Sequence, residues 1–225
     1  MHPLSEQAIA CLSHCSVLPV LTLSNVDSAL YIGESLVSAG VHVAEITLRS
    51  PAALSAIELL SSKLPELQVG AGTLLHTAQL KDVKNAGGKF ALSPGIHESF
   101  LINALDVGLP YIPGVATPSD VMLAQAAGYG FCKLFPAKTL GGTEYIKALA
   151  GPFPQMQFCP TGGIRIAEAA EFLALDSVVC VGSSKLVPTE WMNPAKDEQQ
   201  ENQNPLHVHI KKIMSTIMST AVSAI

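Results

Sequence analysis

The chain has 225 residues, of which 48% are hydrophobic, and a formal net charge of -5 at pH 7. This length and apolar content suit one α/β domain with a large core, so we expect a single domain over residues 1–225. The acidic balance, with no basic cluster longer than Lys211-Lys212, argues against nucleic acid or a membrane surface as a partner. A small molecule is the expected partner.

Neither end of the chain has the pattern of a targeting or membrane-spanning segment. Residues 1–21 lack the basic start and the small-residue cleavage site of a signal peptide. The apolar segment 206–225 is interrupted by two histidines and two lysines, which disfavours a membrane span. We therefore expect a cytoplasmic protein with no membrane contact.

The five cysteines predict no disulfide framework. Their number is odd, and Cys132, Cys159 and Cys180 lie in apolar runs where a cysteine is ordinarily a small buried hydrophobe. Two further cysteines and a histidine lie close together within residues 11–15, but no second pair of ligands accompanies them. One face of an N-terminal helix is the favoured interpretation, and no metal or cofactor is expected.

Eight short apolar runs rich in β-branched residues recur along the chain, and each predicts a buried strand. In chain order they are SVLPVLTL (16–23), VHVAEIT (41–47), LQVGAG (67–72), KFALS (89–93), PYIPG (110–114), GFCKLF (130–135), MQFCPTG (156–162) and SVVCVG (177–182). Segments with helical spacing lie between them, such as residues 26–40. Ser50 with Pro51, and Thr117 with Pro118, are typical of helix starts, since the hydroxyl caps the helix and proline suits its first turn.

Apolar strands that alternate with helices indicate a parallel sheet covered by helices. Eight such units in 225 residues predict an α/β fold, a compact (β/α)8 TIM barrel. Residues 5–15 are expected to form an extra N-terminal helix that closes the bottom of the barrel, and the polar residues 193–205 an exposed loop before the final helix. A doubly wound sheet is disfavoured because no GxGxxG turn follows the first predicted strand.

The carboxyl ends of the strands are where such a barrel collects its chemistry. The residues delivered there are Glu45, Thr47, Arg49, Gly72, Thr73, Pro94, Lys133, Phe135, Thr161, Gly162, Gly163, Gly182, Ser183 and Ser184. Because alternate residues of a strand share a face, Glu45 and Arg49 are expected on one side of their strand, and Lys133 with Phe135 on one side of theirs. A carboxylate, a guanidinium and an amine would then share one cavity.

Lys133 in an otherwise apolar strand has two interpretations. Burial favours the neutral amine, which can attack a carbonyl and form a Schiff base. Alternatively, Lys133 and Glu45 form a structural ion pair. Arg49 and Thr73 favour the first interpretation, because a planar guanidinium and a hydroxyl suit a substrate carboxylate.

Two glycine-rich or serine-rich turns follow the last two predicted strands, TGGI at 161–164 and GSS at 182–184. Such turns offer unobstructed backbone N–H groups to a phosphate. Each could also be a plain tight turn, but their occurrence on adjacent strands favours a phosphate site.

Six motifs, in order, resemble those of a known family. They are AEITLRS, VGAGTLL, FALSPGI, YIPGVATPSD, FCKLFPA and CPTGGI, within residues 16 to about 190. They are similar to those of the 2-keto-3-deoxy-6-phosphogluconate (KDPG) aldolases, some of which act on 4-hydroxy-2-oxoglutarate. The resemblance implies a metal-independent class I pyruvate aldolase in a (β/α)8 barrel, usually a homotrimer. Such a lyase cleaves KDPG to pyruvate and glyceraldehyde 3-phosphate through a lysine Schiff base.

The resemblance also assigns roles by position. Lys133 would form the Schiff base, Glu45 would be the general acid and base, and Arg49 would hold the pyruvate carboxylate. The other expected contacts are Thr73 at the carboxylate, Pro94 and Phe135 as walls of that pocket, Thr161 beside it, and Gly162, Gly163, Ser183 and Ser184 at the phosphate. The chain departs from the family pattern at Ser183, where a second glycine is expected, and at Lys185, where many members carry an aromatic residue.

Other activities stay open at this point. The sugar acid could instead be 4-hydroxy-2-oxoglutarate or 2-dehydro-3-deoxy-6-phosphogalactonate. A phosphosugar isomerase or epimerase would use Glu45 as a base without needing a covalent lysine. A non-catalytic barrel that binds small anions would use the same turns and keep Lys133 in an ion pair.

Overall fold

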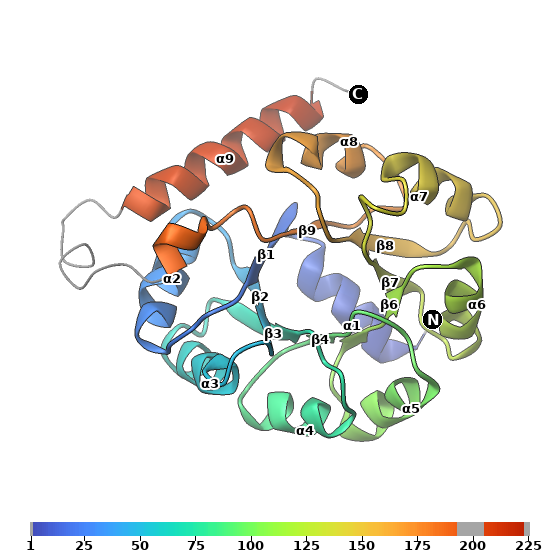
Figure 1. Ribbon diagram of the computed structural model, residues 1–225, viewed down its shortest axis with the longest axis horizontal. Helices are drawn as coiled ribbons and strands as arrows, with labels where there is room; N and C mark the ends of the chain where they lie inside the picture. Colours follow the sequence, from blue (N-terminus) through green and yellow to red (C-terminus); the bar gives the residue numbers. More distant parts are fainter. Residues whose placement is uncertain (1, 193–204, 223–225) are drawn as a thin grey trace.

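The computed structural model describes residues 2–192 and 205–222, and apart from Pro205 the predicted loop at 193–205 lies outside this part. Parallel strands lie at the centre of the molecule and helices surround them (Figure 1). This is the α/β arrangement of parallel strands that the alternating pattern predicts.

Short parallel strands make up two hydrogen-bonded sheets in the described part of the chain. The strands are β1 (Val17–Leu21), β2 (Val43–Thr47), β3 (Gln68–Gly72), β4 (Ala91–Leu92), β5 (Tyr111–Ile112), β6 (Gly114–Val115), β7 (Phe131–Leu134), β8 (Gln157–Pro160) and β9 (Val181–Ser183). One sheet has the order β5-β4-β3-β2-β1-β9 and the other β6-β7-β8. One isolated bridge joins Thr161, just after β8, to Gly182 in β9, and another joins Phe158 in β8 to Val178, which precedes β9.

The fifth predicted strand, residues 110–114, is interrupted at Pro113. It appears as β5 and β6, which belong to different sheets. Proline has no N–H to donate to a neighbouring strand. Its carbonyl still accepts a hydrogen bond from the N–H of Lys133 at 2.9 Å.

The helices lie around the strands, except the N-terminal helix, which crosses one end of them at the centre of the view (Figure 1). They are α1 (Pro3–Leu12), α2 (Asp27–Ser38), α3 (Ala53–Lys63), α4 (Ala78–Asn85), α5 (Glu98–Val107), α6 (Pro118–Ala126), α7 (Thr143–Ala150), α8 (Ala169–Leu173) and α9 (Pro205–Val222), with 3-10 turns η1 (Ile166–Glu168) and η2 (Thr189–Met192). None of the helices in this described part combines the length and apolarity that crossing a bilayer requires.

The two predicted helix starts have different outcomes. Thr117 caps α6 with Pro118 in the first turn, and Thr117 and Asp120 form a reciprocal capping box, which confirms that prediction. The prediction for Ser50 is wrong: α3 begins at Ala53, after a turn, and its cap residue Ala52 has helical dihedral angles and makes no side-chain hydrogen bond. Ser50 lies before this turn, too early to reach the free N–H groups of the helix.

Apolar side chains pack in two separate clusters. The larger cluster lies between the strands and the surrounding helices, and includes Ile46 and Leu134. The smaller cluster joins three side chains of the N-terminal segment, those of Ala8, Leu12 and Cys15, to inward side chains such as Val43 and Phe131, which begin their strands. α1 and the turn after it therefore cover the amino-terminal end of the strands, and leave the carboxyl ends for the polar residues.

Candidate active site

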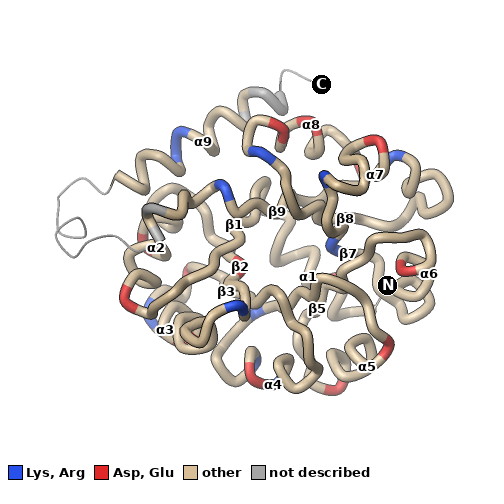
Figure 2. Tube along the Cα trace, in the orientation of Figure 1, with Lys and Arg blue, Asp and Glu red and all other residues tan. Residues whose placement is uncertain are grey.

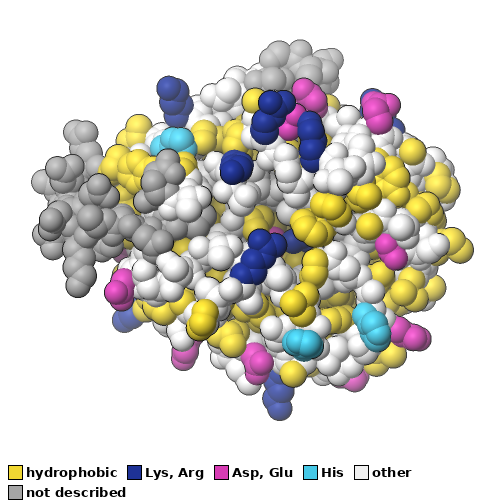
Figure 3. Space-filling model, in the orientation of Figure 1, with side chains coloured by type: hydrophobic (Ala, Val, Ile, Leu, Met, Phe, Trp, Pro, Cys, Tyr) yellow, Lys and Arg dark blue, Asp and Glu magenta, His cyan; other side chains and the backbone are white. Residues whose placement is uncertain are grey.

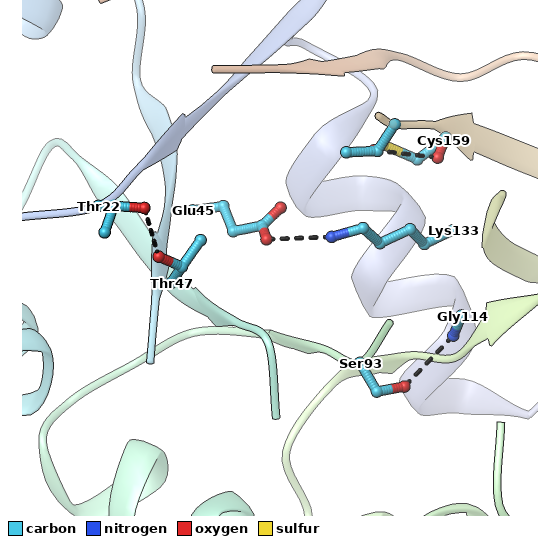
Figure 4. Close-up of polar contacts among 8 residues, drawn as sticks. Thr22, Glu45, Thr47, Ser93, Gly114, Lys133 and Cys159 are labelled. Carbon is cyan, nitrogen blue, oxygen red and sulfur yellow. Dashed lines mark hydrogen bonds and ion pairs between the residues drawn. The ribbon is translucent and has the colours of Figure 1, made fainter. Parts of the chain in front are cut away.

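Lys133 and Glu45 lie opposite each other inside the ring of strands. Lys133 extends from β7 and Glu45 from β2, and their Nζ and Oε1 atoms are 3.1 Å apart (Figure 4). The exposed fractions of the two side chains are only 6% and 0%. Oε2 of Glu45 is buried and has no hydrogen-bond partner among the described residues, so one carboxylate oxygen remains available to a ligand or water.

Gly72 makes room for the carboxylate of Glu45. β2 and β3 pair in parallel, with Thr47 opposite Gly72. A Cβ atom on Gly72 would lie 1.7 Å from Oε1 of Glu45, so any side chain here would displace the carboxylate from Lys133. Thr73 follows with a φ of 61°, a left-handed conformation that is uncommon for a β-branched residue.

Pro94 reaches the same region because β6 contains a glycine. Gly114 is the neighbour of Lys133 across the β6–β7 pairing, and a Cβ on it would lie 2.4 Å from the carbonyl carbon of Pro94. Ser93 holds this segment in place, since its hydroxyl accepts a hydrogen bond from the N–H of Gly114 at 3.3 Å (Figure 4). The same hydroxyl contacts the hydroxyl of Tyr111 at 2.5 Å.

A cavity of about 170 Å³ opens beside this pair at the ends of β1, β7, β8 and β9. Its lining consists of Val20, Arg49, Phe135, Thr161, Gly162, Gly163, Ile164, Arg165, Gly182, Ser183, Ser184 and Lys185. The Nζ atom of Lys133 lies 5.7 Å from the centre of the ring of Phe135, which lines the cavity. Seven predicted site residues thus share one cavity, while Lys133, Glu45, Thr73 and Pro94 lie outside its lining.

The two turns at the far end of the cavity depend on glycine. Gly162 and Gly163 have φ values of 102° and 75°, which favour glycine. A Cβ on Gly182 would lie 2.2 Å from Oγ1 of Thr161, so the two turns approach each other closely. The hydroxyl of Ser183 donates to the carbonyl of Ile164 at 3.4 Å and adds a polar link between them.

Some residues of the site escape prediction from the sequence. Thr22 follows β1 and shares a hydrogen bond of 2.8 Å between its Oγ1 and that of Thr47 (Figure 4). Arg165 follows the glycine turn, and its guanidinium donates to Glu168 at 2.7 Å. Thr22 lies in an ordinary apolar run, so no pattern singles it out. Arg165 could have been noticed from its position two residues after the glycine pair.

Glu168 organises the basic side chains behind the glycine turn. It accepts hydrogen bonds from the guanidinium of Arg165 and from the ammonium of Lys138, the latter at 2.5 Å. These two cations, with the backbone N–H of Arg165, lower the pKa of Glu168 to about 2. Glu168 is therefore ionised at neutral pH and holds Arg165 and Lys138 at the base of η1.

Two of the buried cysteines, Cys15 and Cys132, have the environment of small hydrophobes. Burial raises the pKa of the Cys15 thiol to about 12 and also raises the pKa of Cys132. Cys159 is the neighbour of Lys133 across the β7–β8 pairing, and its sulfur lies 3.7 Å from Oγ1 of Thr161. Among residues 2–192 and 205–222, no group of three histidine, cysteine or acidic side chains could hold a metal ion.

Comparison with known proteins finds a family model and curated relatives that match most of the chain. The family model described as "KDPG and KHG aldolase" matches residues 8–202. The KHG/KDPG aldolase of Escherichia coli K12 is 44% identical over 174 residues, which cover 77% of this chain and 82% of that protein. The 2-dehydro-3-deoxy-phosphogluconate aldolase of Pseudomonas aeruginosa is 39% identical over 191 residues, covering 84% of this chain and 87% of that protein.

Solved structures are similar over nearly the whole chain. The KDPG aldolase of Legionella pneumophila, with pyruvate captured as a covalent carbinolamine intermediate, has a TM-score of 0.84 and 38% identity, covering 92% of this chain and 97% of that one. The 2-keto-3-deoxy-6-phosphogluconate aldolase of Zymomonas mobilis with 3-phosphoglycerate has a TM-score of 0.83 and 34% identity, covering 92% and 94%.

Proposed function

The chain belongs to the KDPG and KHG aldolase family, and on that premise we propose that it cleaves KDPG into pyruvate and glyceraldehyde 3-phosphate through a Schiff base on Lys133. The observation that carries this proposal is the buried pair of Lys133 and Glu45, with a distance of 3.1 Å between Nζ and Oε1 and a second carboxylate oxygen that has no partner in the described structure. The covalent pyruvate adduct of the Legionella relative supports the same chemistry.

The lysine supplies the nucleophile and the carboxylate moves the protons. Glu45 first takes a proton from the ammonium of Lys133, so that the neutral amine attacks the C2 carbonyl while Glu45 gives this proton to the carbonyl oxygen. Glu45 then takes a proton from the nitrogen and returns it to the resulting hydroxyl, which leaves as water. The resulting iminium withdraws electrons from the C3–C4 bond. Glu45 then accepts the proton of the C4 hydroxyl as this bond breaks and glyceraldehyde 3-phosphate leaves. Protonation of the enamine at C3 and hydrolysis release pyruvate and regenerate the amine.

The surrounding residues bind the two charged ends of the substrate. We assign Arg49 and Thr73 to the pyruvate carboxylate, because a guanidinium offers paired N–H donors that match a carboxylate. Pro94 and Phe135 form apolar walls near the amine, and Thr161 lies between the two ends. Backbone N–H groups and hydroxyls at Gly162, Gly163, Ser183 and Ser184 receive the phosphate. Support comes from the cavity that these four residues line together with Arg49.

The finer architecture is also part of the proposal. We infer that β5 and β6 together act as the fifth strand of one (β/α)8 barrel over residues 1–225, with α1 closing its bottom. The short bridges between β8 and β9 and the inner apolar cluster support this closed form. A homotrimer, which the family resemblance implies, and a cytoplasmic location, which the sequence pattern favours, are proposals as well, and light scattering on the purified protein tests the trimer.

Trapping with pyruvate and sodium borohydride tests the chemistry directly. We expect mass spectrometry to find one reduced pyruvate adduct, mapped to Lys133, in the native protein and in Lys81→Ala, whose lysine is exposed on α4. Lys133→Ala should carry no adduct and have no KDPG cleavage above background. A folded native protein without an adduct, or a Lys133→Ala variant with near-normal turnover, would refute the proposal and return Lys133 to a structural ion pair.

A further inference from the structure

Side-chain charge at the phosphate end of the cavity distinguishes this site from one built on backbone groups alone. Two basic side chains, Arg165 and Lys185, belong to the lining of the cavity in addition to Arg49, which is assigned to the pyruvate carboxylate, and no acidic residue does. Figure 2 shows basic positions near the centre of the view beside β8 and β9, while acidic positions lie mainly on the outer helices. The cavity therefore suits a ligand with more than one negative charge.

Resting on the proposed aldolase function, we propose that Lys185 is a specificity-determining residue for this reaction. Its ammonium, assisted by Arg165, selects substrates that carry a terminal phosphate dianion over those, such as 4-hydroxy-2-oxoglutarate, that carry a carboxylate directly on C4.

The backbone holds Lys185 at the edge of the cavity. Lys185 follows β9, and its N–H donates to Oγ of the buried Ser183 at 3.2 Å. Ser183 in turn bonds to Ile164, so the turn that carries Lys185 is fixed against the glycine turn that carries Arg165. In the space-filling view, dark blue side chains gather over the middle and upper part of this face, and magenta side chains lie mainly at its edge (Figure 3).

Arg165 and Lys185 differ in how much of their charge is already compensated. Arg165 and Lys138 share the carboxylate of Glu168, at 2.7 Å and 2.5 Å. The ammonium of Lys185 has no ion pair or side-chain hydrogen bond among the described residues. Lys185 gives up no existing partner when it binds an anion. A phosphate therefore gains more binding free energy from Lys185 than from Arg165.

The ammonium of Lys185 binds a terminal group more tightly when that group carries more negative charge. A phosphate monoester carries about -1.5 to -2 at pH 7 and offers three acceptor oxygens, whereas a carboxylate carries a single charge. In KDPG this group is attached at C6, two carbons beyond C4. The carboxylate of 4-hydroxy-2-oxoglutarate is attached at C4 itself and so lies closer to Lys133. An ammonium beyond the glycine turns thus favours the phosphorylated substrate.

Steady-state kinetics of Lys185→Met with two substrates tests this inference. We expect kcat/KM for KDPG to fall by about 10-fold to 100-fold, the loss of one charge-assisted hydrogen bond. The value for 4-hydroxy-2-oxoglutarate should change less than about 3-fold, because that substrate does not reach Lys185. Lys185→Arg should keep most of the activity on KDPG, and Lys81→Met should leave both substrates unaffected. Equal losses on both substrates, or no loss on KDPG, would overturn the inference.

Binding of glycerol 3-phosphate, measured by calorimetry, tests Lys185 independently of catalysis. The native protein should bind this phosphate monoester at least about 10-fold more tightly than Lys185→Met. Pyruvate trapping with borohydride should be equal in the two proteins, because it depends on Lys133. Equal phosphate affinities would overturn the role of Lys185 and leave the aldolase proposal intact. Absence of the pyruvate adduct from both proteins would count against the aldolase proposal alone.

Discussion

One oxygen of the buried Glu45 carboxylate is left free by the pairing with Lys133, as a group that transfers protons to a substrate requires. A buried ion pair is stable only when its remaining hydrogen-bonding groups are satisfied, because both charges have lost their water. Oε1 of Glu45 meets Lys133, but the buried Oε2 has no partner among the described residues. A substrate hydroxyl or the water of Schiff-base formation would satisfy it.

Gly72→Ala tests whether the position of Glu45 matters. The added Cβ would lie 1.7 Å from Oε1 and 2.7 Å from Cγ of Glu45, so the whole buried side chain must move away from Lys133. We expect kcat for KDPG to fall by about 100-fold or more, since a displacement of about 1 Å costs that much. Pyruvate trapping by borohydride should also slow.

Gly151→Ala is the matched control for this prediction. Gly151 ends α7 with a φ of -54°, and a Cβ there would make only an ordinary contact of 3.6 Å with the carbonyl of Ala148. Its kcat should equal that of the native protein. If Gly72→Ala also kept native kcat, the carboxylate of Glu45 would not need its observed position.

Charged residues inside apolar strands are easier to single out from the sequence than hydroxyls that act through long-range contacts. Lys133, Glu45 and Arg49 can be found because charges are rare in apolar strands and their spacing places them on known faces. Thr22 and Ser93 cannot be found in this way, because hydroxyl side chains are common in strands. Their roles depend on contacts with Thr47 and Gly114, which are far away in the sequence.

At the scale of elements, the two predicted helix starts each have a serine or threonine followed by proline. They should differ in how much the hydroxyl contributes to the free energy of unfolding. Thr117→Ala removes the side-chain half of the capping box at α6, so we expect the free energy of unfolding to fall by about 1 kcal/mol. Ser50→Ala should cost clearly less, because the buried hydroxyl of Ser50 has no hydrogen-bond partner in the described structure. Urea titration of both variants measures the difference. Equal costs would contradict the assignment of Thr117 as the only cap of the two.

The difference between these helix starts shows a limit of local patterns. A hydroxyl residue followed by proline begins α6 directly. Before α3 the same pattern, Ser50 with Pro51, precedes a turn, because residues 48–52 lie between the end of β2 and the start of the helix. The break at Pro113 is similar: proline predicts a missing hydrogen bond, but the sequence does not show that β5 and β6 pair with different sheets. Strand order is a property of the assembled fold.

At the scale of the whole molecule, the alternation of apolar strands and helices in the sequence predicts the architecture. Each strand–helix unit has apolar residues that must be buried in the same way. Every apolar strand needs helices on one side and other strands' side chains on the other. That requirement, repeated along the chain, leads to parallel strands with helices outside. The inner cluster adds a second requirement: the amino-terminal ends of the strands must also be covered, and α1 with its following turn does this through Ala8, Leu12 and Cys15.

Leu12→Ala tests whether α1 is part of the core. Leu12 has no exposed surface and packs with the inward side chains of the strands, so its truncation leaves a cavity that we expect to lower the free energy of unfolding by about 2–5 kcal/mol. Ile9→Ala, at a half-buried position of the same helix, should cost less. Because the polar site lies at the opposite ends of the strands, the pyruvate adduct on Lys133 should form normally in both variants. A cost for Leu12→Ala no larger than that for Ile9→Ala would mean that α1 only lies on the surface, and the strands would then need another cover for their amino-terminal ends.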